Sequence, residues 1–219
     1  MVRRFFPLLC TALMLGTSLP AAEVTAKFDM ESWPEGAPPR EDVFVVEGEI
    51  QVKKVEGQGV LEIEPEPIVD ANAQVGASAK GSARIRARIW AAKRARSYPR
   101  IGLGVHGISG YRLLLNAPRR QVELVKNDEV VATADFQWTT ETWTWLELSA
   151  RPGAAEGDPW IIEGRAWTEG APMPEKALID HRDDSGMKGS GKCSIWGTPY
   201  SEQPIRFDDI EVAVEVAES

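Results

Sequence analysis

The sequence predicts an all-β fold, because short segments that alternate apolar and polar residues recur along most of the chain. In residues 83–90, the clearest case, isoleucine and alanine fall on one face of an extended strand and arginine on the other. No alternation of strands with long helices is visible, and this argues against dinucleotide-binding and P-loop folds. Many short strands joined by turns fold into a sandwich or a barrel.

The expected strands follow one another closely along the chain. They span residues 49–52, 60–64, 83–90, 100–107, 111–116, 121–126, 130–134, 143–150, 160–167, 193–197 and 205–214. The dipeptide Asn127-Asp128 separates two of them and is typical of a hairpin turn. Short helical turns are expected only at residues 91–95 and 175–180, so residues 23–216 are predicted to form one domain.

The last expected strand contains a change of phase. Its apolar residues occupy odd positions up to Phe207 and even positions from Ile210 onwards. Side chains alternate strictly along a regular strand, so this change requires an extra residue. The sequence therefore predicts a β-bulge at Asp208-Asp209, which would turn one of the two carboxylates in a new direction.

Residues 1–22 have the composition of a secretory signal peptide. Arg3 and Arg4 form a basic start, residues 5–16 are mostly apolar, and small residues follow at positions 20–22. The alternative, an N-terminal helix packed into the core, is disfavoured by the two arginines. We expect the rest of the chain to be exported, to the periplasm or outside the cell, and it contains no further stretch long enough to span a bilayer.

The few cysteines and histidines and the net charge exclude other classes of function. Removal of residues 1–22 takes Cys10 with it, so Cys193 is expected to be a lone, buried and unreactive thiol. Two histidines and two cysteines argue against a zinc centre. The formal net charge of −8 argues against a nucleic-acid partner. That charge is unevenly spread, because residues 71–122 contain eleven basic residues and no acidic one.

Four segments resemble the exported concanavalin A-like (laminin G-like) jelly rolls. These are FDMESWPEGAPP (28–39), VVEGEIQV (45–52), WTEGAPMP (167–174) and FDDIEV (207–212). The resemblance implies a single jelly-roll β-sandwich of two antiparallel sheets, a fold whose members include glucanases and sugar-binding modules. In outline the chain is also similar to 3-keto-disaccharide hydrolase-type domains, although the Asn-Ser-Gly strand motif of that group is absent.

The resemblance also implies a structural Ca²⁺ ion where the first and last strands meet. Asp29, Glu31, Asp208 and Asp209 lie in the two matching segments, and carboxylate oxygens are the ligands that calcium prefers. The alternative is that these residues form ordinary caps and ion pairs at strand ends.

No catalytic residues are predicted. Jelly-roll glucanases carry Glu-x-Asp-x-x-Glu on one strand, and this chain lacks the motif: Glu156 and Asp158 match its first two places, but Ile161 stands at the third. His181 lies among aspartates in an expected solvated loop. The chain is therefore predicted to bind carbohydrate or another surface polymer without chemistry. A glycoside-active enzyme with an unrecognised carboxylate pair, and a structural or adhesive cell-surface module, are the alternatives.

Arginines are the first candidate ligand-binding residues. Arg84, Arg86 and Arg88, with Arg112 near them, would offer planar donor groups to the carboxylates or sulfates of an anionic glycan. The alternative is that acidic residues of neighbouring strands pair with this row. The acids considered for such pairing are Glu62, Glu64 and Glu123.

Tryptophans are the second candidates, because sugar rings stack on exposed aromatic rings. Trp33 and Trp138 stand in turn-like segments and are the expected exposed ones. Trp143 and Trp145 share one face of a strand and are expected to pack in the core.

Overall fold

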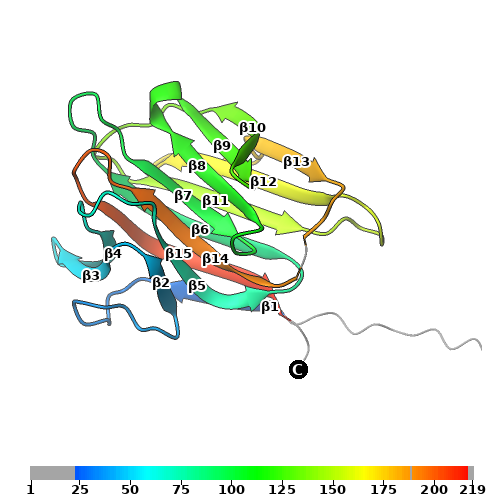
Figure 1. Ribbon diagram of the computed structural model, residues 1–219, viewed down its shortest axis with the longest axis horizontal. Coiled ribbons are helices and arrows are strands. Elements are labelled where there is room, and N and C mark those ends of the chain that lie inside the picture. The colour runs from blue at the N-terminus through cyan, green and yellow to red at the C-terminus, as the bar shows by residue number, and fades with distance from the viewer. Residues whose placement is uncertain (1–22, 188, 217–219) are drawn as a thin grey trace, which may run out of the picture.

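Two antiparallel β-sheets lie face to face and form a sandwich (Figure 1). The structure is a computed structural model that describes residues 23–187 and 189–216. It confirms the predicted all-β sandwich of two antiparallel sheets. The predicted signal peptide, residues 1–22, lies outside the described residues. Among the described residues, no helix is long and apolar enough to cross a membrane.

The first sheet, sheet A, has eight strands in the order β13-β12-β11-β6-β15-β4-β3, and β1 pairs with β15 beside this path. Its strands are β1 (Glu23–Phe28), β3 (Ile50–Val55), β4 (Gln58–Ile63), β6 (Ala83–Ala91), β11 (Thr144–Arg151), β12 (Trp160–Thr168), β13 (Ile179–Asp183) and β15 (Ile205–Glu215).

The second sheet, sheet B, has seven strands in the order β10-β9-β8-β7-β14-β5-β2. Its strands are β2 (Val43–Glu47), β5 (Ala71–Ala79), β7 (Arg100–Val105), β8 (Tyr111–Asn116), β9 (Gln121–Lys126), β10 (Glu129–Asp135) and β14 (Gly191–Thr198). One short 3₁₀ turn, η1 (Ala117–Arg119), joins β8 to β9 at the top of Figure 1.

The hydrophobic core lies between the two sheets, and β6 shows how the sequence builds it. Ile85, Ala87 and Ile89 are fully buried, while the arginines between them point away from the core. Leu103 and Leu113 fill the same core from the facing sheet. Complete burial of an apolar side chain contributes roughly 1.5–3 kcal/mol, so the period-two pattern fixes which face of each strand is inside.

Each expected strand is present within a few residues of its predicted ends, and four further strands were not expected: β1, β2, β5 and β13. The core positions of β5 include Ala71 and Ala73, which carry little hydrophobic signal in a sequence. The prediction of a solvated loop around His181 is wrong, because this residue lies in β13, a charged edge strand. An edge strand can carry charged side chains and still pair with its one neighbouring strand. Such a strand lacks the alternation of apolar and polar residues by which the other strands were predicted.

The predicted hairpin turn is confirmed, whereas the predicted helical turns are not. Asn127 and Asp128 have φ angles of 50° and 62°, the left-handed pair that a two-residue hairpin loop requires. The helical turns expected at residues 91–95 and 175–180 are absent. A tight β-bridged turn follows β6 in the first case, and β13 begins within the second.

The predicted bulge in β15 is confirmed. The register of β15 against β6 shifts between Asp208 and Glu211, and Asp209 has a φ angle of 48°. The bulge also marks a change of neighbour along the other edge of β15. Residues up to Phe207 pair with β4, and residues from Ile210 onwards pair with β1.

Candidate functional site

The predicted arginine row lies on the outer face of sheet A and is ion-paired along its length. Arg84 and Arg86 share Glu211, at 2.7 and 2.9 Å, and Arg88 contacts Asp208 at 2.5 Å. Both acids lie on β15, directly beside β6. The alternative that neighbouring strands supply acidic partners therefore describes this face, and a ligand role for the row stays a prediction.

The acids that pair with the row are not the ones considered from the sequence. Glu62 contacts Arg206 at 2.7 Å, and Glu64 contacts Lys53 at 2.9 Å, both on the β3–β4 side of sheet A. Glu123 lies on sheet B. Strand order within a sheet decides which charges meet, and the sequence does not reveal that order.

The ion pairs also set the charge state of this face. Burial acts to raise the pKa of Glu211, but the hydrogen bond from Arg84 and the positive charges of Arg84 and Arg86 hold that pKa below its usual value. Glu211 is thus ionised at neutral pH and neutralises the row. A guanidinium that is already paired has less to offer an incoming anion.

Two open cavities lie along the same face, and acidic residues outnumber basic ones in each. The larger, about 370 Å³, includes Arg84, Arg151 and Arg165 but also Glu23, Glu147, Glu163 and Glu215. The smaller, about 290 Å³, includes Lys27 and Arg86 together with Asp29, Asp209 and Glu211. The outer face of sheet A therefore has no surplus of positive charge with which to attract a polyanion.

The expectation that Trp143 and Trp145 pack in the core is wrong. Both lie on the outer side of sheet A, with the guanidinium carbons of Arg88 and Arg86 at 4.7 and 5.5 Å from their ring centres. Trp145 also stacks on Trp167, with ring centres 5.7 Å apart. The residues of β11 that face the core alternate with the tryptophans and include Leu146. The two indoles therefore lie on the outer face, where the arginine side chains cover part of each ring.

The other predicted aromatic residues are not exposed platforms. Trp138 is only 6% exposed and packs against Tyr98, with ring centres 6.4 Å apart. Trp33 is half-buried and packs against Phe28, with ring centres 6.0 Å apart. Turn-like sequence indicated exposure, but the loops that carry these indoles fold over the ends of the core.

The four predicted calcium ligands do not come together as one set. Asp29 and Asp209 line the same 290 Å³ cavity, but Asp208 is bound to Arg88, and Glu31 accepts a hydrogen bond from the backbone of Gly59 at 3.0 Å. The described residues contain no group of three or more His, Cys, Asp or Glu side chains suited to a metal ion. Calcium binding stays a prediction, which a rise in melting temperature with added calcium would support.

A different candidate site lies on the outer face of sheet B. In β14, Cys193 and Ile195 point into the core, so Ser194, Trp196 and Thr198 point outward. Cys193 itself is a buried free thiol, as the sequence predicts, and burial raises its pKa to about 12.

Strand β7 provides a floor without side chains for this site. Its outward positions include Gly102 and Gly104, which pair with Trp196 and Ser194 of β14. A Cβ atom on Gly104 would lie 2.4 Å from the Ser194 hydroxyl oxygen and 3.0 Å from the Trp196 Nε1 atom. Only glycine therefore allows the indole to lie over β7.

Arg112 reaches the same place from the other side of β7. It lies on β8, and its guanidinium carbon is 4.8 Å from the ring centre of Trp196. The expectation that Arg112 lies near Arg84, Arg86 and Arg88 is wrong, because β8 belongs to the opposite sheet. The indole holds the guanidinium in place, and the outward edge of the guanidinium contacts Asp128 of the exposed hairpin turn.

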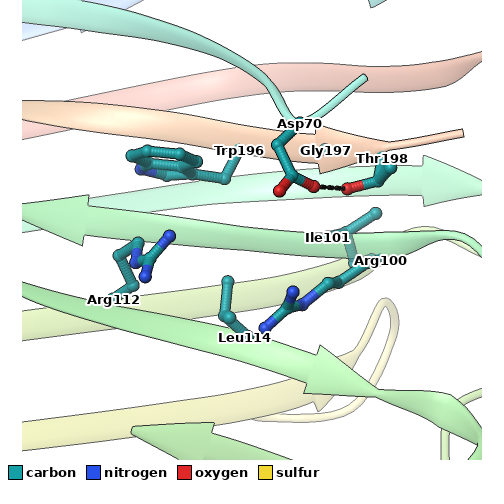
Figure 2. A pocket seen from close by; sticks show the side chains of 8 residues that line it. All are labelled: Asp70, Arg100, Ile101, Arg112, Leu114, Trp196, Gly197 and Thr198. Atoms are coloured by element: carbon teal, nitrogen blue, oxygen red, sulfur yellow. Dashed lines mark hydrogen bonds between the residues drawn. The ribbon is translucent and has the colours of Figure 1, made fainter. Parts of the chain in front are cut away.

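Figure 2 shows the shallow depression beside this contact, which we call the sheet B site. Arg100 and Arg112 bracket Leu114 in this view, and the Thr198 hydroxyl donates a hydrogen bond to Asp70 across the upper rim. Among the described residues, no carboxylate lies within ion-pairing distance of Arg100. The depression has only about 20 Å³ of enclosed space, so it suits a ligand that lies along the face and not one that enters a pocket.

A local signal for this site is present in the sequence of β7. The pattern Gly-x-Gly in an alternating strand marks a strip of sheet without side chains, and an aromatic residue on a neighbouring strand is expected to cover it. Locating Trp196 next to Gly102 and Gly104 requires the strand order of sheet B, which joins β7 to the distant β14.

No protein-family model matches the chain, and no curated protein matches its sequence. Solved structures do share its fold. Carbohydrate-binding module CBM66 from Bacillus subtilis is 16% identical, with a TM-score of 0.51 over 78% of this chain and 94% of the module. The metal-free carbohydrate recognition domain of Emp46p is 11% identical, with a TM-score of 0.54 over 82% of this chain and 90% of that domain.

The alginate lyase Aly36B is 8% identical, with a TM-score of 0.55 over 92% of this chain and the whole of that one. Identities this low show the fold alone, and they place this chain among the concanavalin A-like β-sandwiches, as the sequence resemblance implied. These structures include a carbohydrate-binding module and an alginate lyase, so the fold itself does not distinguish binding from catalysis.

Proposed function

We propose that the chain is an exported, non-catalytic carbohydrate-binding protein whose sheet B site holds an acidic polysaccharide. Export is supported by the composition of residues 1–22. Carbohydrate binding is supported by a fold shared with carbohydrate-binding proteins.

The observation that carries the proposal is the contact between Arg112 and Trp196 over the glycine strip of β7. The indole fixes the plane of the guanidinium, so less conformational freedom is lost when its donors bind a carboxylate. Arg100 supplies a second guanidinium at the other end of the depression. Two arginines along a shallow face suit successive acidic sugars of an extended chain.

The sheet B site differs in charge from the outer face of sheet A. Asp70 is the one acid in its lining, against Arg100 and Arg112, whereas acids predominate in both cavities of sheet A. Arg112 also pairs with Asp128, but that carboxylate is 90% exposed, and such a surface pair is weak enough for a ligand carboxylate to replace it. Asp70 and Thr198 face the same depression and provide a hydrogen-bond acceptor and a hydroxyl for sugar hydroxyl groups.

Calorimetry with polygalacturonate oligosaccharides tests the proposal, with neutral dextran oligosaccharides as the comparison. We expect the acidic oligosaccharide to bind more tightly, and its affinity to fall steeply as salt screens the arginines. Replacing Arg100 with glutamine, or Trp196 with alanine, should weaken binding at least about tenfold, because the first removes a guanidinium of the site and the second removes the indole that holds Arg112 in place.

The matched control is Trp90→Ala, which also removes an indole beneath an arginine, but on sheet A, where Arg206 lies 4.5 Å above it. Equal losses of affinity for the acidic oligosaccharide in Trp196→Ala and Trp90→Ala would contradict the proposed location of the binding site on sheet B. Release of reducing ends or unsaturated products from the oligosaccharide would instead identify an enzyme. Binding of neither polymer would favour a structural or adhesive module.

A further inference from the structure

A further pocket lies at the end of the sandwich that carries η1. Figure 1 shows η1 at its top. Its volume is about 470 Å³, and three separate segments line it: the loop from β6 to β7, the turn around η1, and the loop from β10 to β11. We call it the end pocket. It shares no lining residue with the sheet B site.

Hydrogen bonds between the segments hold the walls of the end pocket together. The backbone N–H of Lys93 donates to the Thr140 hydroxyl at 2.9 Å, and the backbone N–H of Phe136 donates to the carbonyl oxygen of Arg120 at 2.9 Å. The backbone N–H of Glu141 donates to the carbonyl oxygen of Ala91 at 2.9 Å. The pocket is therefore a built feature of the fold and not a gap between independent loops.

Basic residues and no acidic ones line the pocket. Lys93 and Arg120 are its charged residues, and both come from the acid-free part of the sequence, residues 71–122. Within the described part of the chain, neither has a carboxylate within ion-pairing distance. On sheet A, by contrast, arginines such as Arg84 and Arg86 are paired.

Trp138 adds an unused hydrogen-bond donor to this lining. Its side chain is 6% exposed, and its Nε1 atom has no hydrogen-bond partner within the described structure. An indole N–H donates and cannot accept, and leaving such a donor buried without a partner costs about 1–3 kcal/mol. A bound acceptor would remove this cost.

We propose that the end pocket binds an anionic substituent of a glycan, a sulfate ester or a carboxylate. Lys93 and Arg120 provide the positive charge, and Trp138 lines the pocket with an indole N–H that has no partner in the described structure. The Thr139 and Thr140 side chains line the same space and add hydroxyl groups. Charged donors and oxyanions form the stronger class of hydrogen bonds, so this set favours an oxyanion over a neutral sugar hydroxyl.

The indole N–H resonance of Trp138 reports this binding directly in a ¹⁵N-correlation spectrum of the labelled protein. Glucose 6-sulfate and glucuronate are titrated separately, so that the two sources of negative charge are distinguished, and glucose is the neutral comparison. We expect a saturable shift of the Trp138 signal with one or both anions and none with glucose. The Trp138→Phe variant identifies the signal, and sequential assignment identifies it should that variant not fold.

The double variant Lys93→Gln/Arg120→Gln should lower the affinity for the anion at least about tenfold. The matched control, Lys176→Gln/Arg182→Gln, removes the same charge from exposed residues outside the pocket and should leave the affinity unchanged. No shift of the Trp138 signal, an equal shift with glucose, or unchanged affinity in the first variant would each overturn the proposal.

This proposal stands apart from the function proposed for the sheet B site. Trp196→Ala should not alter the response of Trp138 to the monosaccharide anions, because Trp196 does not line the end pocket. Loss of polygalacturonate binding without loss of the Trp138 shift would thus confine a failure to the sheet B site. The reverse result would confine it to the end pocket.

Discussion

Arg112 and Trp196 meet above β7, although they belong to the strands on either side of it. Gly104 makes this possible, because a Cβ atom there would lie only 3.0 Å from the Trp196 Nε1 atom. Three neighbouring strands supply the parts of this contact: β8 carries Arg112, β7 carries the glycines and β14 carries Trp196. Each part can be tested by its own substitution.

The first prediction concerns the planar shape of Arg112. Arg112→Lys keeps the positive charge but removes the flat, delocalised group that lies over Trp196. We expect the affinity for polygalacturonate to fall nearly as far as in Arg112→Ala, about tenfold or more, with an unchanged melting temperature. An affinity for Arg112→Lys equal to that of the unmodified protein would show that charge alone is recognised.

The second prediction concerns the floor of the site. Gly104→Ala would place a Cβ atom 2.4 Å from the Ser194 hydroxyl oxygen, and this would force Ser194 and Trp196 to move. We expect a loss of about 1–3 kcal/mol in the free energy of unfolding, measured by urea denaturation, together with weaker glycan binding. Gly57→Ala is the comparison that separates backbone strain from a steric clash, because no atom lies within 4 Å of a Cβ there but its φ angle is 86°.

The third prediction concerns the buried carboxylate of Asp208, whose side chain is 4% exposed and contacts Arg88. Arg88→Met leaves this carboxylate without its charged partner and should cost about 3 kcal/mol in the free energy of unfolding. Arg86→Met should cost less, because Glu211 keeps Arg84 as a partner. Equal costs for the two variants would contradict this account.

The loss of stability in Arg88→Met should depend on pH. Burial already raises the pKa of Asp208, and loss of Arg88 removes an interaction that opposes this rise. A protonated carboxyl is neutral and needs no cation beside it. The deficit of Arg88→Met relative to the unmodified protein should therefore shrink as the pH falls from about 7 to about 4. Thermal melts across this range measure the deficit, and one that stays constant would be the contrary result.

The fourth prediction concerns Asp183 on β13. Burial acts to raise the pKa of Asp183, but hydrogen bonds from Lys126, Ser185 and Tyr111 lower it to about 2. A carboxyl whose pKa is lower in the folded state stabilises the protein above its ordinary pKa and loses this effect as the pH falls. Asp183→Asn should therefore cost about 2 kcal/mol at neutral pH and progressively less as the pH falls from about 4 to about 2.

Denaturation curves between these pH values measure this difference. Asp180→Asn is the matched control on the same strand, because Asp180 is about half exposed and, among the described residues, pairs only with the exposed Arg182. A pH-independent cost for Asp183→Asn would show that Asp183 acts through shape and not through charge.

The sequence predicted the parts of this fold that depend on local alternation. The bulge at Asp208-Asp209 and the turn at Asn127-Asp128 follow from the spacing of a few neighbouring residues, and both are present. β5 was missed because its core positions are small, and β13 was missed because an edge strand carries charges.

The candidate sites depend on pairings that local patterns do not contain. Arg84, Arg86 and Arg88 were placed correctly on one face, but their partners come from a strand more than a hundred residues away. Arg112 was expected near this row but lies on the opposite sheet, and the order of strands that separates them is likewise absent from local patterns. Trp138 was identified as a ligand candidate by its turn-like surroundings, yet it lines the end pocket from a buried position.

The shared carboxylate of Glu211 has a consequence for how such a protein can change over time. Glu211 forms ion pairs with Lys27, Arg84 and Arg86. A substitution of any one of these cations therefore changes the strength of the two remaining ion pairs. Replacements at these positions on the outer face of sheet A are therefore energetically coupled. Arg100 has no ion-pair partner among the described residues and can be exchanged with little effect on stability, so the site that we propose on sheet B can change its charge while the fold stays constant.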